Sequence, residues 1–371
     1  MTAHAHVVGW GKSVPRRVLT NDDLTQMVDT SDDWIRTRTG ISERRIVQDG
    51  ETTASLAIQA SQQALEVAGL NPTQLDMIIV ATATPDHAFP STACLVQDAL
   101  GATHAAAFDL AAGCSGFVYA LSMAADLISA GAYENVLVIG AETLSHITDW
   151  SDRATCVLFG DGAGAVVLQT NESDGGVLST VLGADGSGGD LLYLPAGGSK
   201  HPTSHHTVTE RLHYVKMKGR EVFRFAVRTM PAATREVIEQ AGLEVSDLSL
   251  LIPHQANQRI IEASTRALKL EPEVVFSNVD RYGNTSAASI PIALCEAVEE
   301  GRIQRDDLVV CVGFGAGLTW GAAAIRWSAP LPLVPPSRWE KARYRLRYRY
   351  AALRSLVRRF LRWLLSLGVK E

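Results

Sequence analysis

The chain has 371 residues, of which 46% are hydrophobic and 20% charged, a composition typical of an ordinary soluble globular protein that can bury a sizeable core. No uncharged apolar run approaches the ~20 residues of a membrane-spanning helix, and the N-terminal stretch MTAHAHVVGWGK lacks the apolar core of a signal peptide. The five cysteines are an odd number with no CxxC spacing and no metal-ligand pattern, so we expect a reduced, cytoplasmic protein without a metal site.

One unit of the chain recurs 173 residues further on. Residues 61–82 read as an amphipathic helix, a glycine C-cap, a short loop and a buried strand, and residues 234–255 read the same way. The strand-like run 134–142 has a counterpart at 306–315. Strands that alternate with helices indicate an α/β fold. Any two such units look alike, but a repeat of this length favours a duplicated domain with a pseudo-twofold axis.

Within the first half, residues 108–117 (FDLAAGCSGF) place Cys114 between a predicted strand and a predicted helix. The N-terminus of a helix carries unpaired N–H groups and a partial positive charge, which favours a thiolate. Gly113 allows the tight bend, and the small neighbouring residues leave room for a substrate. Cys295 and Cys311 lie in apolar helix and strand patterns that suit core packing. Cys114 is therefore the candidate nucleophile, although a cysteine after a strand often packs in a core.

The second half supplies two polar residues that could serve this nucleophile. His254 lies just past the buried run 248–252, and ligands bind α/β sheets at such strand ends. Asn284 follows another strand-like run, and we align residues 283–285 with residues 113–115 of the cysteine motif. A twofold arrangement would then turn both helix starts toward one cleft. Cysteine, histidine and asparagine would provide a nucleophile and two hydrogen-bonding groups.

Seven segments, in the same order along the chain, resemble β-ketoacyl-[acyl-carrier-protein] synthase III of the thiolase superfamily. They cover about residues 5–328 and are residues 29–41, 108–117, 149–167, 217–223, 252–260, 283–291 and 313–321. The resemblance implies an α/β, thiolase-like, duplicated five-layer αβαβα fold with five strands in each half, and a homodimer. We expect an N-terminal half at 1–172 that carries the nucleophile and a C-terminal half at 173–328 that carries the histidine and asparagine.

The resemblance implies a decarboxylating Claisen condensation that initiates fatty acid synthesis. Cys114 would take an acyl group from acyl-CoA as a thioester, and malonyl-acyl carrier protein would then bind. His254 and Asn284 would hold the malonyl thioester oxygen while carbon dioxide leaves. The backbone N–H groups of Cys114 and Ala316 would bind the acyl oxygen, and the product would be 3-oxoacyl-acyl carrier protein. No step needs a metal or a nicotinamide, so we expect no cofactor and acyl-CoA as a substrate only.

The resemblance also implies residues that bind the substrates. The CoA contacts would be Thr30, Trp34, Arg38, Arg153, Gly219, Phe223 and Asn257, with the adenine held between the Trp34 ring and the Arg153 guanidinium. The acidic carrier protein would dock on Arg220 and Arg259. The acyl pocket would be formed by Leu158, Phe314 and a Phe89 that reaches across from the partner subunit.

Two other functions stay open at this point, and the acyl primer is not determined. A same-fold acyltransferase or condensing enzyme could use a different acceptor in a specialised lipid or secondary-metabolite pathway, because it would keep the same three residues. A non-catalytic acyl-binding relative is disfavoured by the intact cysteine, histidine and asparagine.

The resemblance ends near Trp327, before a tail that the family does not explain. A proline-rich linker is expected at 329–337 and a basic amphipathic helix at 338–371. Residues 338–371 contain 11 Lys and Arg and 2 Asp and Glu, so the tail is basic. The preceding residues contain 23 Lys and Arg and 38 Asp and Glu, so the body is acidic. Such helices lie in membrane interfaces. We expect peripheral contact with an anionic membrane, against the alternative that the helix packs on the acidic body or its dimer mate, and no nucleic acid is expected.

Overall fold

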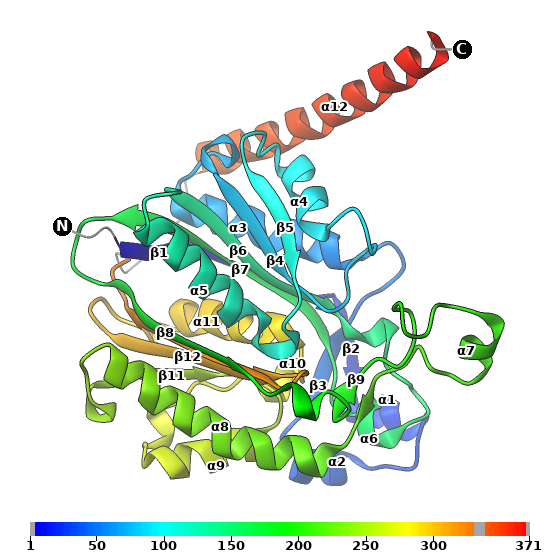
Figure 1. Ribbon diagram of the computed structural model, residues 1–371, viewed down its shortest axis with the longest axis vertical. Coiled ribbons are helices and arrows are strands. Elements are labelled where there is room, and N and C mark those ends of the chain that lie inside the picture. The colour runs from blue at the N-terminus through cyan, green and yellow to red at the C-terminus, as the bar shows by residue number, and fades with distance from the viewer. Residues whose placement is uncertain (1–3, 330–337, 369–371) are drawn as a thin grey trace.

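The protein is described by a computed structural model that covers residues 4–329 and 338–368. Three layers of helices alternate with two sheets (Figure 1). The layers of helices, from one outer face through the middle to the other outer face, are α3 (Thr53–Ala68) with α4 (Thr92–Leu100), α5 (Gly116–Ser129) with α11 (Ser289–Glu299), and α8 (Gly219–Gln240) with α9 (Gln258–Leu268). The predicted five-layer αβαβα fold is therefore present.

The first sheet has five strands in the order β1-β7-β6-β4-β5. Every residue of β4 and β6 is buried, because helices cover both faces, and this explains the continuous apolar runs of these strands. The strand β4 is parallel to β5 and β6, and β7 is antiparallel to β6 and β1. The bounds are β1 (His4–Ser13), β4 (Met77–Ala81), β5 (Ala106–Leu110), β6 (Asn135–Thr143) and β7 (Asp161–Asn171).

The second sheet has four strands in the order β11-β12-β13-β8, where the family resemblance predicts five. At the fifth place Val275 forms a single bridge to Leu251. In the segment between the turn η6 (Pro272–Val274) and the helix α10 (Val279–Tyr282), the Phe276 N–H donates to the Leu251 carbonyl at 2.9 Å. The strands are β8 (Gly176–Ala184), β11 (Leu250–Pro253), β12 (Leu308–Gly315) and β13 (Thr319–Arg326).

The shorter elements lie around these layers and between their members. The antiparallel pair of β2 (Arg17–Thr20) and β3 (Glu43–Ile46) lies beside α1 (Asn21–Thr25) and α2 (Asp32–Thr39), which connect the two strands along the chain. The others are η1 (Pro72–Gln74), η2 (Gly113–Ser115), η3 (Leu144–His146), α6 (Arg153–Cys156), η4 (Gly186–Gly188), β9 (Leu192–Tyr193), α7 (His205–Thr209), β10 (Lys216–Met217), η5 (Val245–Asp247) and η7 (Ser286–Ala288).

Three pairs of central elements correspond between the two halves at an offset of 173 residues. The strand β4 begins at residue 77 and β11 at 250, β6 begins at 135 and β12 at 308, and α5 begins at 116 and α11 at 289. The turn η2 at 113–115 therefore matches η7 at 286–288. Our alignment of residues 113–115 with 283–285 is wrong by three residues, because Asn284 precedes the turn instead of lying in it.

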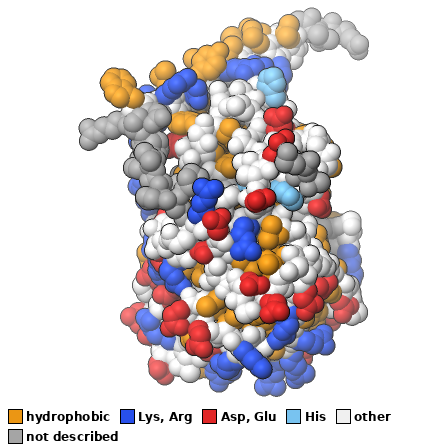
Figure 2. Space-filling model, turned by 90° about the vertical axis from the view of Figure 1, so that its left-hand side faces the viewer, with side chains coloured by type: hydrophobic (Ala, Val, Ile, Leu, Met, Phe, Trp, Pro, Cys, Tyr) orange, Lys and Arg blue, Asp and Glu red, His pale blue; other side chains and the backbone are white. Residues whose placement is uncertain are grey.

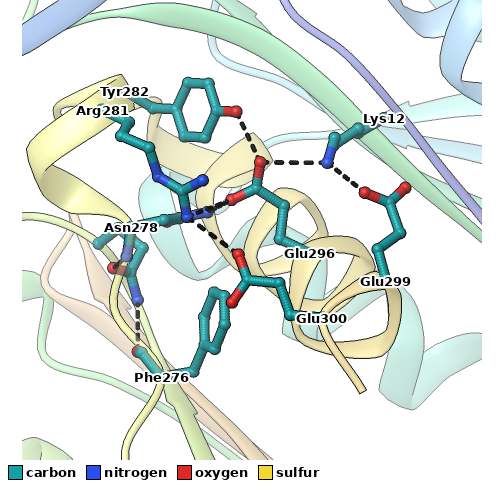
Figure 3. Close-up of polar contacts among 9 residues, drawn as sticks. Lys12, Phe276, Asn278, Arg281, Tyr282, Glu296, Glu299 and Glu300 are labelled. Atoms are coloured by element: carbon teal, nitrogen blue, oxygen red, sulfur yellow. Dashed lines mark hydrogen bonds and ion pairs between the residues drawn. The ribbon is translucent and has the colours of Figure 1, made fainter. Parts of the chain in front are cut away.

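A buried polar cluster joins the first strand to the segment that leads to Asn284 (Figure 3). The carboxylate of Glu296, only 4% exposed, accepts hydrogen bonds from the Tyr282 hydroxyl at 2.6 Å and the Asn278 amide at 2.9 Å. Lys12 on β1 lies 3.1 Å from the same carboxylate. Burial opposes ionisation of Glu296, but the hydrogen bonds and the Lys12 charge outweigh it and lower the pKa of the carboxyl. The cluster thus fixes α10 immediately ahead of the Asn284 loop.

A helix is present in the predicted tail and packs beside α4 (Figure 1). It is α12 (Arg338–Gly368), 31 residues long, or about 46 Å at ~1.5 Å per residue. The Ser355 hydroxyl donates to Asp98 on α4 at 2.5 Å, and Arg359 pairs with the same carboxylate at 3.1 Å. Apart from Ala329, the predicted linker lies outside the described residues. None of the described helices has an apolar stretch long enough to cross a membrane.

Candidate active site

A cavity of about 150 Å³ between the two halves is lined by Cys114, His254 and Asn284. Each residue comes from a different segment: the turn η2, the loop after β11 and the loop before η7. The sequence therefore identifies three residues that the fold brings to one place. Their catalytic roles stay predictions.

Cys114 lies in η2, between β5 and the first turn of α5, and is 7% exposed. The preceding Gly113 has a φ of +54°, and a Cβ at this residue would lie 2.8 Å from the Ala316 nitrogen, so glycine is required here. Burial raises the pKa of the Cys114 thiol to about 12, although a hydrogen bond with Ser286 acts in the opposite direction. Burial therefore opposes the thiolate that the helix N-terminus is expected to favour, and the reactivity of the thiol stays a prediction.

The glycine-rich end of β12 packs directly against the backbone of Cys114. A Cβ on Gly315 would lie 2.5 Å from the Cys114 nitrogen. Ala316 and Cys114 both line a second cavity of about 110 Å³. The two backbones that carry the predicted oxyanion donors are thus neighbours, and their role as donors stays a prediction.

His254 is held by groups from three directions. Its backbone N–H donates to the Val312 carbonyl at 2.8 Å, and its Nδ1 lies 2.6 Å from the Ser289 hydroxyl. Its ring packs edge-to-face with the Phe314 ring, and the two ring centres are 5.2 Å apart. The Nε2 atom is buried and has no hydrogen-bond partner within the described residues. Burial lowers the pKa of His254 to about 3, so the ring is neutral at physiological pH. When Ser289 donates to Nδ1, Nε2 carries the ring proton and can donate into the cavity.

Asn284 is fixed through both its backbone and its side chain. Its N–H donates to the Leu158 carbonyl at 2.8 Å, and its carbonyl accepts from the Gly160 N–H at 3.0 Å. Its Oδ1 accepts from the Ser286 N–H at 2.9 Å. Because the side-chain oxygen is engaged, the amide NH₂ is the group that can donate to a ligand in the cavity.

Two buried polar residues beside Cys114 are not identified from the sequence. Ser286 has a φ of +49°, and its hydroxyl forms hydrogen bonds with the Cys114 thiol and the Glu142 carboxyl. Glu142 is completely buried at the end of β6 and accepts from the Thr84 hydroxyl at 2.6 Å. Burial raises the pKa of Glu142. A charged residue that ends the apolar run 134–142 was the available signal.

The predicted CoA contacts form a line from the cavity to the surface. Gly219, Phe223 and Asn257 line the cavity. The Asn257 amide donates to the Arg38 carbonyl at 3.1 Å. The guanidinium groups of Arg38 and Arg153 lie 5.7 and 4.9 Å from the centre of the Trp34 ring. The hydroxyl of Thr30, which is also among the predicted contacts, is buried without a partner among the described residues.

The remaining predicted residues divide into those at the cavity and one that is elsewhere. Leu158 and Phe314 line the cavity. Arg220 and Arg259 are exposed, and the Arg259 guanidinium lies 5.7 Å from the ring centre of Phe223 at the cavity wall. Phe89 is 87% exposed and lines neither cavity, so a single chain does not bring it to the acyl site.

A duplicated αβαβα fold with cysteine, histidine and asparagine around one cavity between its halves defines a thiolase-fold condensing enzyme. Models of the 3-oxoacyl-[acyl-carrier-protein] synthase III family match residues 108–186 and, for its C-terminal part, residues 238–327. The chain is 58% identical over 324 residues to β-ketoacyl-[acyl-carrier-protein] synthase III of Caldanaerobacter subterraneus, which covers 87% of this chain and 98% of the relative. The chain belongs to the β-ketoacyl-[acyl-carrier-protein] synthase III family, as predicted.

Solved structures agree with this assignment. The crystal structure of 3-oxoacyl-[acyl-carrier-protein] synthase III from Aquifex aeolicus has a TM-score of 0.81 and 51% identity, and the match covers 87% of this chain and 100% of that one. The priming β-ketosynthase of the R1128 polyketide biosynthetic pathway has a TM-score of 0.81 and 36% identity, with 88% and 97% covered. The family models end at residue 327, so α12 lies beyond the matched region.

Proposed function

We propose that the chain condenses an acyl-CoA primer with malonyl-acyl carrier protein to give 3-oxoacyl-acyl carrier protein, CoA and carbon dioxide, and so initiates fatty acid synthesis. The observation that carries the proposal is the cavity in which a buried thiol, a neutral imidazole and a primary amide come together. These groups match the needs of acyl transfer followed by decarboxylation.

In the first half-reaction, the Cys114 sulfur attacks the thioester carbonyl of acyl-CoA. The bond between sulfur and the acyl carbon forms, the bond to the CoA sulfur breaks, and the thiol proton ends on CoA. With a thiol pKa of about 12, the proton leaves as the new bond forms, since little thiolate exists beforehand. The N–H groups of Cys114 and Ala316 would stabilise the oxyanion.

In the second half-reaction, the malonyl group loses carbon dioxide and its electron pair moves into the thioester as an enolate. The Nε2–H of His254 and the amide of Asn284 would donate to the enolate oxygen, which carries more charge in the transition state than in the ground state. The nucleophilic carbon then attacks the acyl thioester, and Cys114 leaves as a thiolate and takes up a proton. The steps are acyl transfer, decarboxylation and formation of a carbon–carbon bond, and none of them requires a metal or a redox group.

The substrates would enter from the Trp34 side. The line from Trp34 through Arg38 and Asn257 supports a CoA path, with the adenine between Trp34 and Arg153. Arg259 beside Phe223 supports docking of an acidic carrier protein at the cavity mouth, together with the exposed Arg220.

We further propose a homodimer in which Phe89 enters the partner's acyl pocket and each half, 1–172 and 173–328, supplies its own part of the site. All five cysteines are free, which fits a cytoplasmic enzyme whose nucleophile must stay reduced. Residues 338–371 would provide peripheral contact with a membrane.

The similarity to one solved structure supports a second candidate function, condensation with a different acceptor. The 36% identity to a priming β-ketosynthase of a polyketide pathway is compatible with a different acceptor in a specialised pathway. The chemistry at Cys114 would be the same in both cases.

The test is an assay of the full chain with a panel of acyl-CoA primers and malonyl-acyl carrier protein, read by the mass of the carrier-bound product. We expect a 3-oxoacyl product extended by the malonyl-derived unit, and no product from Cys114→Ser. Acyl transfer without release of carbon dioxide would favour the alternative acceptor.

A further inference from the structure

The helix α12 has a docked face made of small and aromatic residues. Tyr344, Ala351 and Ser355 are 7%, 7% and 9% exposed. A Cβ on Gly101 would lie 2.8 Å from the Ala351 side chain, so the helix lies against the end of α4 with little space between them. This face is held to the body by Asp98, which binds both Ser355 and Arg359.

The opposite face of α12 is apolar and exposed, and we call it the outer stripe. Its six residues follow one another at spacings of four and three, which places them on one side of a helix. At ~100° per residue, this side is about half a turn from Ala351 and Ser355. The outer stripe consists of Leu346, Tyr350, Leu353, Val357, Phe360 and Leu364, which are 70, 68, 59, 48, 56 and 43% exposed. Figure 2 shows hydrophobic side chains in a row along the top of the molecule, with Lys and Arg below them.

Arginines flank the outer stripe on both sides. At ~100° per residue, Arg343, Arg347, Arg354 and Arg358 lie on one side of the stripe and Arg345 and Arg349 on the other. Residues 341–370 contain no Asp or Glu. An exposed apolar stripe of this length marks an interaction surface, and its flanks require a partner with negative charge.

A groove beside α12 carries both apolar residues of the outer stripe and arginines. It has a volume of about 580 Å³, lies between α12 and residues 71–73 and 100–101, and is lined on α12 by Leu346, Tyr350 and Leu353 as well as by Arg347, Arg349 and Arg354. Its arginines can reach phosphate groups that approach from the side of the outer stripe.

A second copy of α12 would fit the apolar pattern but not the charges. The spacing of the outer stripe is that of a coiled-coil seam. In such a pair, Arg347, Arg349 and Arg354 of both helices would lie beside the seam, and the sequence offers no acidic residue between 341 and 370 to oppose them. The other positions beside the seam are Leu356, Leu361 and Trp363. Like charges across a seam destabilise it. A phospholipid surface supplies both hydrocarbon for the stripe and phosphate for the flanks.

We propose that α12 lies in the plane of an anionic phospholipid membrane, with the outer stripe inserted and the flanking arginines on lipid phosphates, while Asp98 and α4 hold the enzyme body to the helix. Amphipathic helices of this kind bury the apolar face to a depth of ~5–10 Å, and arginines favour the phosphate level. The proposal specifies the membrane contact of the proposed function, and it does not depend on the condensation reaction.

The test is flotation of the full chain with vesicles of phosphatidylglycerol and phosphatidylcholine, and with phosphatidylcholine alone. We expect the chain to float with the anionic vesicles only. The variant Leu353→Ser/Val357→Ser/Phe360→Ser should remain unbound. The matched control Val208→Ser changes an apolar side chain that is 60% exposed on α7 and should float as the parent chain does. Replacing Arg347 and Arg354 with Gln should weaken binding about fivefold for each arginine at low salt.

Three outcomes would overturn the proposal. The first is equal flotation of the parent chain and the triple variant, and the second is equal binding to both kinds of vesicle. The third is absence of flotation of the parent chain with anionic vesicles. In that case a fall in molar mass, by light scattering, from the parent chain to the triple variant would assign the stripe to a second copy. Condensation activity of the triple variant without vesicles shows that it is folded. If no variant or parent chain condenses substrate while flotation behaves as expected, the proposed function fails and the membrane proposal stands.

Discussion

Gly113 and Ser286 occupy equivalent places in the two halves and share the same unusual backbone, with φ of +54° and +49°. Each opens the short turn that leads into a central helix. The turn after Gly113 presents the thiol, and the hydroxyl of Ser286 meets that thiol from the other half. A serine with positive φ costs on the order of 1 kcal/mol or more, and the hydrogen bond that its hydroxyl forms with the sulfur gives this serine a role at the site.

Replacing Ser286 with Ala should slow the reaction of Cys114 with electrophiles. The hydrogen bond from Ser286 acts to lower the pKa of the thiol, and loss of one hydrogen bond of ~1 kcal/mol corresponds to about a fivefold effect. The measurement is the rate of iodoacetamide alkylation of Cys114 against pH, by peptide mass. Ser286→Gly, which relaxes the backbone but also lacks the hydroxyl, should behave like Ser286→Ala; recovery of the parent rate in the glycine variant would show that only backbone strain matters.

Replacing His254 with Ala should affect condensation more than acylation. His254 is assigned to the malonyl thioester oxygen, and loss of one oxyanion donor lowers kcat by about 10²–10³-fold. Acylation is measured by transfer of a labelled acyl group from acyl-CoA to the chain, and condensation by the carrier-bound product. Equal loss in both half-reactions would contradict the assigned role.

The rate of the condensation step should show no ionisation near the usual histidine pKa. Burial lowers the pKa of His254 from 6.5 to about 3, so the ring stays neutral throughout the range in which the enzyme is folded and active. We expect a flat acid side of the profile of condensation from pre-acylated enzyme. A fall in the condensation rate centred near pH 6.5 that disappears in His254→Ala would contradict this prediction. It would mean that the ring becomes charged near pH 6.5 and that the charged ring does not support condensation.

Glu296 should make the fold sensitive to acid. Its folded-state pKa is lowered from 4.5, so its contribution to stability is present above pH 4.5 and is lost as the pH falls through the folded-state pKa. Glu296→Gln should lower the free energy of unfolding at neutral pH by about 1–3 kcal/mol and flatten its dependence on pH below 4.5. Urea unfolding at several pH values measures both. A parallel pH dependence in the two proteins would assign acid sensitivity to other groups.

Phe89→Ala should broaden the range of acyl primers. Phe89 is 87% exposed in one chain, and the proposed dimer places it in the partner's acyl pocket, where a smaller side chain would leave more space. The acyl-CoA panel should shift toward longer or branched primers. Met27→Ala, at a residue that is 47% exposed, serves as the control. An unchanged primer range for Phe89→Ala in an intact dimer would sink this assignment.

The sequence predicts the buried strands well, for local reasons, and it identifies three residues that the fold brings to one cavity. Strands such as Met77–Ala81 read as apolar runs because they are buried on both faces, and the repeat makes the second half visible. The contacts of Ser286 and Glu142 with Cys114 could not be predicted in the same way. They depend on how two turns, 173 residues apart, meet across the pseudo-twofold axis, and on a thiol environment that desolvation dominates.

The cluster around Glu296 also has a consequence for the order of folding. Lys12 and Glu296 are separated by 284 residues, so the support of the Asn284 loop closes only when almost the whole chain is available. Cys114 is covered by Gly315 and Ser286, which also belong to the late part of the chain. We therefore expect the thiol of the first half to stay unshielded during synthesis until the second half folds onto it, so that the future nucleophile is open to oxidants at that stage.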